Sequence, residues 1–216
     1  MDEKKPISGA SSRRNLRLGR ALNQIVTRAP WLWPVIRNPM RSFFDQRAQG
    51  WDERTAAGSP EHLAPLAAGL LEVSPAPERA LEIGTGTGTG ALLIAREFPR
   101  ARVRGVDISE QMVHHARKRI GLDPEGRVAF RVADASSLPY QDESFDLVAE
   151  LNMPPFFAEI ARLLRPGGFL VHGSSWGAET PFWTPEEVLR RRFAKHGIEE
   201  VKSGGAARGS FWVGRK

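Results

Sequence analysis

The stretch ALEIGTGTGTGALLIA, residues 80–95, places a glycine at every second position between two apolar segments, the first of which carries an acid. Ala80, Leu81 and Ile83 predict a short buried strand, and residues 91–95 predict the start of a helix. Glycines in such a turn adopt backbone angles that other residues avoid and let a ligand approach the helix N-terminus. The stretch therefore predicts a strand, a tight turn and a helix that together bind a nucleotide-like molecule.

Two interpretations of this turn compete. Gly86, Gly88 and Ala91 satisfy G-x-G-x-x-A, the dinucleotide fingerprint of a nicotinamide-binding oxidoreductase. Glu82 and the glycines also form E-x-G-x-G-x-G, with the carboxylate on the strand just before the turn. A carboxylate there repels a pyrophosphate and suits a cation, and S-adenosylmethionine is the common nucleoside cofactor with a cationic amino-acid tail. The acid therefore favours S-adenosylmethionine.

Acidic residues also end the next two predicted strands. Asp107 closes the strand in ARVRGVDIS, 23 residues after Gly84, where a carboxylate can accept hydrogen bonds from both ribose hydroxyls. Ser109 is the expected N-cap of the helix at residues 110–120. Asp134 and Ala135 end the strand that starts at residue 127, where they can meet the amino group and a ring nitrogen of adenine. The sequence thus predicts contacts for each part of an adenosine.

The remaining chain continues the alternation of strands and helices. We expect strands at 145–151 and 169–175, helices at 156–164 and 185–197, and a final antiparallel pair on either side of SGGAARG. The motifs E-x-G-x-G-x-G, G-V-D-I-S, A-D-A-x-x-L-P, F-D-L-V and L-L-R-P-G-G occur in this order. In this arrangement the sequence resembles class I S-adenosylmethionine-dependent methyltransferases of the small-molecule type, similar to quinone-biosynthesis methyltransferases. The resemblance covers roughly residues 51–216.

The resemblance implies an α/β fold with a Rossmann-like, doubly wound, seven-stranded sheet. Helices should cover both faces, an antiparallel hairpin should close the sheet, and a helical extension should precede it. It also implies a cofactor site, whose expected residues are Glu82, Gly84, Thr85 and Gly86 at the methionine end, Asp107 and Ile108 at the ribose, Met112, Asp134 and Ala135 at the adenine, and Glu150.

Methyl transfer to an aligned nucleophile needs mainly proximity, orientation and a dry site. Where the acceptor must lose a proton, a general base helps, and Glu150, Asn152 and His172 fall at the ends of the fourth and fifth predicted strands. Histidine is the side chain that titrates nearest neutrality, so His172 is the candidate catalytic residue. No acidic trio stands at these strand ends, and we therefore expect no metal.

After the fourth strand the sequence is LNMPPFF, which resembles the N-P-P-F signature of amino-group methyltransferases that act on nucleobases or glutamine. Met153 interrupts the signature between Asn152 and Pro154. A small, apolar or aromatic acceptor is therefore the main hypothesis, with Asn152 as a substrate contact. A nucleic-acid or protein amino-group acceptor is the alternative.

Charge divides the chain of 216 residues into two parts. Residues 1–50 hold ten Lys or Arg and three Asp or Glu, whereas the remainder holds 21 and 22, so the net charge of +6 belongs to a basic arm. We expect the arm to be disordered at residues 1–12 and helical at 14–26, and residues 51–216 to form the methyltransferase domain. The chain has no cysteine and no apolar run near the roughly 18 residues of a membrane span.

The arm interleaves arginines with apolar residues, and its tryptophans stand between prolines in APWLWPVIRNP. This pattern favours a lid over an apolar acceptor, with contact to an anionic membrane surface as a secondary role. Trp51 is the candidate lid residue. A phosphate-gripping arm of a nucleic-acid-associated protein is disfavoured by the neutral body. SRRNLR resembles a twin-arginine export signal, but Arg17 and Arg20 interrupt the apolar region that such a signal needs, so we expect a cytoplasmic protein.

Overall fold

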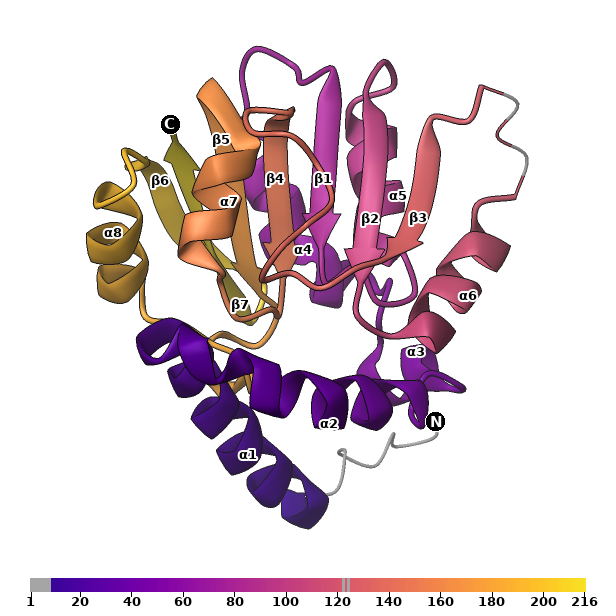
Figure 1. Cartoon of the computed structure of the whole chain (residues 1–216). Coiled ribbons are helices and arrows are strands. Elements are labelled where there is room, and N and C mark those ends of the chain that lie inside the picture. Colours follow the sequence, from indigo (N-terminus) through magenta and orange to yellow (C-terminus); the bar gives the residue numbers. More distant parts are fainter. Residues whose placement is uncertain (1–8, 122, 124) are drawn as a thin grey trace.

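The computed structural model describes residues 9–121, 123 and 125–216. They form one mixed β-sheet with helices around it (Figure 1). Its strands lie in the order β3-β2-β1-β4-β5-β7-β6, the first five parallel and the last two antiparallel to their neighbours. The strands are β1 (Arg79–Ile83), β2 (Arg102–Asp107), β3 (Val128–Val132), β4 (Phe145–Leu151), β5 (Leu164–Ser174), β6 (Glu199–Ala206) and β7 (Gly209–Arg215). The predicted seven-stranded sheet with a closing hairpin is confirmed.

Helices cover both faces of this sheet (Figure 1). They are α1 (Gly9–Arg28), α2 (Trp33–Asp45), α3 (Trp51–Thr55), α4 (Pro60–Leu70), α5 (Thr89–Glu97), α6 (Glu110–Arg119), α7 (Phe157–Leu163) and α8 (Glu186–Ala194), with short 3-10 helices η1 (Pro30–Leu32) and η2 (Gly177–Glu179). Helices α4, α5 and α6 pack on one face of the sheet, and α7, α8 and the arm helices pack on the other. Within the described part of the chain, no helix combines the length and apolarity that crossing a membrane requires.

Two hydrophobic clusters, one on each face, hold the layers together. In β1, Leu81 and Ile83 belong to the cluster under α7, α8 and the arm, whereas Ala80 belongs to the cluster under α4 and α5. Because β1 is covered on both faces, four of its five residues are buried. The alternation also decides the direction of Glu82, which points to the face that α4 and α5 cover.

Local signals position the helix starts. The Ser109 hydroxyl accepts a hydrogen bond from the Met112 amide at 3.1 Å, which confirms the predicted N-cap of α6. Ser59 does the same for α4 by accepting from the amide of His62 at 3.1 Å. Both caps hold helices whose N-termini lie at the carboxyl edge of the parallel strands.

The structure corrects three predicted boundaries. Helix α1 begins at Gly9, so residues 9–12 are helical rather than disordered, and the rest of the stretch predicted to be disordered, 1–8, lies outside the described residues. Strand β5 begins at Leu164 because Leu164 pairs with Phe145, before the register shifts between Phe145 and Leu147. The glycines of SGGAARG continue β6 up to residue 206, and only residues 207 and 208 form the turn.

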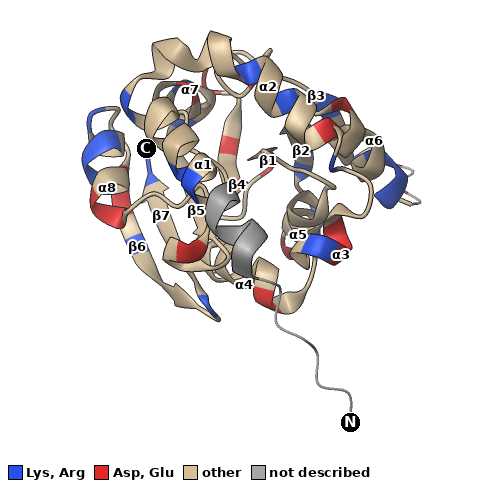
Figure 2. Cartoon of the chain, turned by 90° about the horizontal axis from the view of Figure 1, so that it is seen from below, with Lys and Arg blue, Asp and Glu red and all other residues tan. Residues whose placement is uncertain are grey.

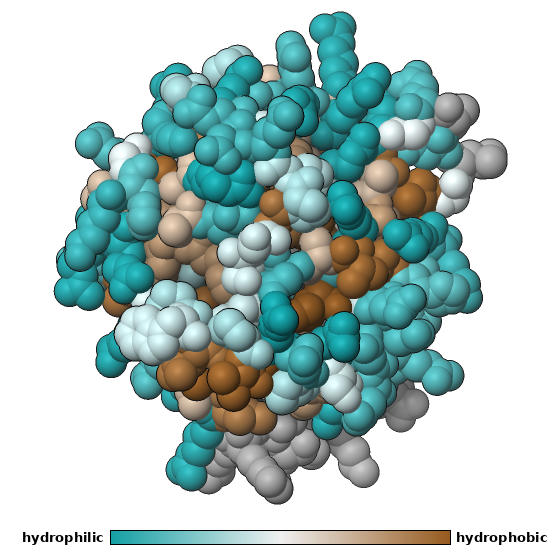
Figure 3. Space-filling view, viewed as in Figure 1, coloured by the Kyte–Doolittle hydropathy of each residue, from teal (hydrophilic) through white to brown (hydrophobic). Residues whose placement is uncertain are grey.

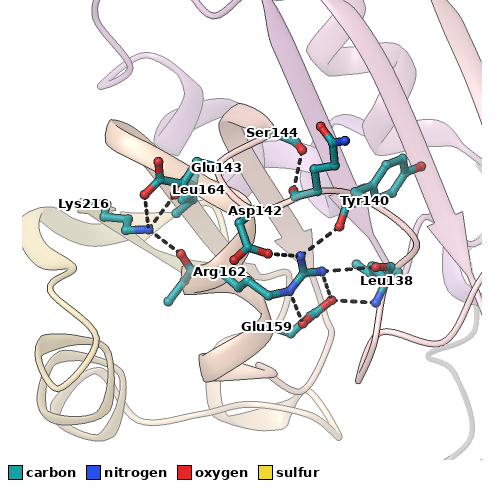
Figure 4. Close-up of polar contacts among 11 residues, drawn as sticks. Leu138, Tyr140, Asp142, Glu143, Ser144, Glu159, Arg162, Leu164 and Lys216 are labelled. Atoms are coloured by element: carbon teal, nitrogen blue, oxygen red, sulfur yellow. Dashed lines mark hydrogen bonds and ion pairs between the residues drawn. The ribbon is translucent and has the colours of Figure 1, made fainter.

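Arg162 of α7 fixes the connection between β3 and β4 (Figure 4). Its guanidinium donates to Glu159 and Asp142 and to the carbonyls of Leu138 and Tyr140, at 2.6 to 3.1 Å. The carboxylates of Glu159 and Asp142 raise the pKa of Arg162, since they stabilise its charged form. Because one side chain satisfies groups on a helix and a loop, the loop that follows β3 is held in place.

Candidate functional site

The glycine loop joins β1 to α5 at the carboxyl edge of the sheet. Gly84, Gly86 and Gly88 all have positive φ, at +71°, +53° and +86°. A Cβ on Gly88 would lie 2.7 Å from the Phe130 ring, and one on Gly84 would lie 2.7 Å from the Met153 sulfur, whereas one on Gly86 would meet open space. Gly84 and Gly88 are therefore needed for packing as well as for conformation, and Gly86 leaves room for a ligand.

Glu82 lies beneath this loop and is 3% exposed. The Thr85 hydroxyl donates to its carboxylate, and a Cβ on Gly90 would overlap it. Burial raises the pKa of Glu82 to about 7, against the opposing effects of the Thr85 hydroxyl and the Ala91 amide. The structure thus places Glu82 and Thr85 as supports of the loop.

Asp107 ends β2 and faces the glycine loop. Its carboxylate accepts hydrogen bonds from the amides of Gly86 and Ser109, both at 2.9 Å. Burial raises the pKa of Asp107 to about 6, although these two amides lower it. A carboxylate has about four lone-pair positions, so the amides leave acceptor capacity for a ligand. The structure thus brings Asp107 and Gly86, two predicted cofactor residues, into contact.

The raised pKa values predict opposite pH responses of the apo protein and its complex. In the unfolded chain both carboxyls ionise near pH 4, so between about pH 4 and 7 the native state binds more protons. The free energy of unfolding should therefore fall as pH rises through this window, by up to about 1.4 kcal/mol per unit of pKa shift. Affinity for a ligand that donates hydroxyls to Asp107 should rise over the same window.

Thermal unfolding of the wild-type protein and of Glu82→Gln from pH 4.5 to 8, with and without S-adenosylmethionine, measures both responses. Without the cofactor, the melting temperature of the wild type minus that of Glu82→Gln should fall with rising pH. The difference should level off above pH 7. A difference that grows with pH, or cofactor affinity that weakens from pH 5 to 7, would contradict the account.

The adenine end of the predicted site already meets the arm. Asp134 accepts a hydrogen bond from the Trp33 indole at 2.7 Å and from the Ser136 amide at 2.9 Å, and Arg37 lies 3.5 Å from its other oxygen. The neighbouring predicted residues Ile108, Met112 and Ala135 are buried or half-buried. Asp134 thus joins the end of β3 to α2, a contact that the sequence did not suggest.

Two further acids of the arm region fasten the cofactor elements. Asp45, at the end of α2, accepts from the Ser109 hydroxyl at 2.6 Å and from the Gln111 amide at 3.2 Å. Asp52 of α3 accepts from the Thr87 hydroxyl at 2.6 Å and pairs with Arg119. Figure 1 shows α2 crossing below the carboxyl ends of the parallel strands. The end of the arm is therefore tied to the start of α6, and α3, which follows the arm, is tied to the glycine loop.

Glu150 and His172 form a buried pair at the ends of β4 and β5. The two residues are register partners, 0% and 3% exposed, and His172 Nδ1 lies 2.7 Å from Glu150 Oε1. With Glu150 as the acceptor of this hydrogen bond, Nδ1 carries the proton and Nε2 keeps its lone pair. Nε2 and Glu150 Oε2 have no hydrogen-bond partner within the described part of the chain.

Asn152 and its neighbours link the acceptor end to the cofactor loop. The Asn152 side chain accepts from the Ser175 amide and donates to the Ser175 hydroxyl, both at 2.8 Å, which ties the ends of β4 and β5 together. Met153 packs over Gly84, because its sulfur lies 2.7 Å from the position that a Cβ on Gly84 would take. His62 of α4 also lies here, with Nδ1 buried and unpartnered among described residues and its pKa lowered by burial. No motif in the sequence pointed to His62.

Trp51, the predicted lid residue, starts α3 and lies half-buried, with its ring 5.7 Å from that of Phe44. Trp33 of α2 donates a hydrogen bond to Asp134, a predicted cofactor residue. In the portion of the chain that the structure describes, no group of His, Asp and Glu side chains could hold a metal ion.

Known proteins are similar to this chain in sequence and in fold. Residues 80–168 match the family described as methyltransferase domain. The 27-O-demethylrifamycin SV methyltransferase of Amycolatopsis mediterranei is 35% identical over 163 residues, 71% of this chain and 59% of that protein. The ubiquinone/menaquinone biosynthesis C-methyltransferase of Desulfotalea psychrophila is 36% identical over 104 residues, 44% of this chain and 40% of that protein. The chain thus spans about half the length of these relatives.

The fold agrees with this match. The structure of phosphoethanolamine N-methyltransferase 2 from Haemonchus contortus, in complex with S-adenosylmethionine, superposes with a TM-score of 0.64 at 19% identity, and the match covers 82% of this chain and 59% of that one. The family match, the strand order and the glycine loop beside Asp107 lead to one conclusion. The chain carries a class I S-adenosylmethionine-dependent methyltransferase domain.

Proposed function

We propose that the protein transfers a methyl group from S-adenosylmethionine to a small, apolar or aromatic acceptor. The observation that carries this proposal is the glycine loop held by Asp107, with open space at Gly86 and an acid beneath the loop. The names of the two relatives described above refer to small molecules, one to 27-O-demethylrifamycin SV and one to ubiquinone and menaquinone biosynthesis. Amino-group transfer to nucleic acid or protein finds no such support.

The residues present fit the cofactor. Asp107 keeps lone pairs for the ribose hydroxyls, and Gly86 leaves open space for the ligand beside the loop. The negative charge of Glu82 favours a cationic tail once the carboxyl is ionised. When bound, the cofactor supplies a sulfonium methyl that an aligned nucleophile can take by in-line displacement. The chain contributes position, exclusion of water and, at one place, a base.

His172 is the base that we propose for an acceptor hydroxyl. Glu150 orients the ring and stabilises the imidazolium that forms when Nε2 takes the proton. Glu150, which we expect at the cofactor, also contacts the candidate base through one oxygen. Asn152, expected at the substrate, acts through Ser175 by holding the two strand ends.

The proposed acceptor class can be tested with S-adenosylmethionine that carries a labelled methyl group. The purified protein is incubated with phenols, apolar alcohols, fatty acids and primary amines, and the labelled products are identified. Transfer to hydroxyl or carbon acceptors supports the proposal. Transfer confined to amines, tRNA or protein glutamine would contradict it.

The arm, residues 1–50, is proposed as a lid over the acceptor. Trp33 is 5% exposed, donates to Asp134 and packs edge-on against Phe156 at 5.1 Å between ring centres. It therefore fastens α2 across the carboxyl edge of the sheet. An acceptor that enters beneath α2 must displace or pass this contact.

Trp33→Ala should loosen the lid, because removing a buried tryptophan costs about 3 to 5 kcal/mol. Limited proteolysis within residues 9–50 should become faster, and methyl transfer should become slower. Trp31→Ala is the matched control, since Trp31 is 72% exposed. If Trp33→Ala changed neither rate, the lid assignment would be wrong.

A peripheral membrane contact is the secondary role that we propose for the arm. Leu18, Trp31, Leu32 and Val35 are exposed, and apolar residues gather over the lower part of the molecule in Figure 3, where the arm lies. Exposed apolar residues beside arginines suit an anionic water–lipid boundary. A cytoplasmic location remains a prediction from the sequence.

A further inference from the structure

A cavity of about 400 Å³ lies between the arm and the body, separate from the glycine loop. Four arginines line it, Arg20 and Arg28 from α1 and Arg191 and Arg192 from α8, and no Asp or Glu is among its described lining residues. Figure 2 shows basic residues on both helices, at the side of the sheet where α1 approaches α8. The cavity therefore joins two segments about 160 residues apart in the chain.

No described carboxylate neutralises the positive charge of these arginines. None of the four arginines lies within ion-pair distance of a described carboxylate. Arg190, next to them on α8, instead pairs with Glu187 and Glu200 at 2.8 and 2.9 Å. Like charges around one cavity repel each other, and an anion between them would remove that repulsion.

The walls of the cavity are held by neutral contacts that leave these charges uncompensated. Arg20 donates to the Ala178 carbonyl at 2.8 Å, and the Arg192 guanidinium lies over the Phe157 ring at 4.9 Å. Asn23 is buried and donates to the Trp183 carbonyl at 2.8 Å and to the Thr184 hydroxyl at 3.1 Å. Two guanidiniums are thus positioned before any ligand binds, which lowers the entropy cost of binding.

We propose that this cavity binds a phosphate group. Phosphate offers more acceptor oxygens and more negative charge than a carboxylate, and the planar guanidinium matches it with paired hydrogen bonds. The group could belong to a soluble phosphorylated molecule or to a lipid headgroup, since Trp31 and Leu32 are exposed just beyond Arg28. In either case the ligand bridges α1 and α8 and holds the arm against the body.

The test removes the two outer arginines together, Arg28→Ala with Arg191→Ala. Both side chains are exposed, so the fold should persist, and Arg100→Ala is the matched control because Arg100 is exposed on another surface. Calorimetry with pyrophosphate probes the soluble source. Cosedimentation with phosphatidylglycerol vesicles, compared with phosphatidylcholine vesicles, probes the headgroup source.

We expect the wild type and Arg100→Ala to bind pyrophosphate or phosphatidylglycerol vesicles, and the double variant to bind the same probe at least tenfold more weakly. The probe that binds identifies the source. The melting-temperature rise given by S-adenosylmethionine should stay the same in all three proteins, so a failure here does not touch the methyltransferase assignment. Absence of binding to both probes, or equal binding by the double variant, overturns the phosphate site.

Discussion

Asp107→Ala should abolish the rise in melting temperature that S-adenosylmethionine gives the wild-type protein. A ligand that binds only the native state stabilises it by about 2.7 kcal/mol at a hundred times Kd. The carboxylate of Asp107 is the acceptor that we assign to both ribose hydroxyls, and each hydrogen bond to a charged group contributes about 1.5 to 3 kcal/mol. Affinity should therefore fall by about 10² to 10⁴-fold.

The matched control for this variant is Asp146→Ala. Asp146 also accepts from two backbone amides, those of Glu78 and Arg79, at 2.7 and 2.8 Å, but at the amino edge of the sheet. Both variants should lower the melting temperature of the apo protein, because both leave backbone amides without an acceptor. Only Asp107→Ala should lose the cofactor response. An undiminished response in Asp107→Ala would remove Asp107 from the cofactor site.

His172→Asn should lower kcat about 10²-fold, the low end for the loss of a general base, while S-adenosylmethionine affinity stays unchanged. Asparagine can place its amide NH₂ near the position of Nδ1 and so keep the hydrogen bond to Glu150. It lacks the basic nitrogen, and the variant therefore separates catalysis from the structural role of the pair. Single-turnover transfer to the best acceptor measures the effect.

Two further variants make this result specific. Glu150→Gln keeps an oxygen that can accept from Nδ1, so its loss should be smaller than that of His172→Asn. His62→Asn changes the half-buried histidine at the acceptor end and should lower kcat less than tenfold. Full activity of His172→Asn, or a larger loss in His62→Asn, would show that His172 is not the base.

The strand ends could be predicted because their signals are local. Asp107 follows an apolar strand and precedes the serine cap of α6, so the strand end and the helix start can both be located from a few adjacent residues. The structure confirms the cap and places Asp107 against Gly86. The order of motifs then indicated the sheet, since parallel strands joined by helices have few ways to pack.

The contacts of the arm could not be predicted because they depend on its path across the sheet. Trp33 meets Asp134 across 101 residues, and the sequence offers Trp31, Trp33 and Trp51 with no local sign of which one turns inward. Asp45 and Asp52 resemble surface acids until α2 and α3 bring them to Ser109 and Thr87. These residues are selected by tertiary packing.

The glycines near the C-terminus show the same limit. SGGAARG has the composition of a loop, yet Gly204 pairs with Phe211 in the sheet and a Cβ on Gly204 would lie 3.3 Å from the Phe211 ring. Likewise, a Cβ on Gly209 would press against the Ser174 carbonyl. The glycines are there because a neighbouring strand or ring occupies the space of a side chain, which composition alone does not reveal.

Calorimetric titration of the full chain with four adenosine-containing ligands shows which cofactor the glycine loop binds. S-adenosylmethionine and its demethylated product, S-adenosylhomocysteine, should bind with a single site per chain, and NAD and NADP should give no measurable heat of binding at the same concentrations. Tighter binding of NAD or NADP than of S-adenosylmethionine would contradict the account and return the glycine loop to the dinucleotide interpretation.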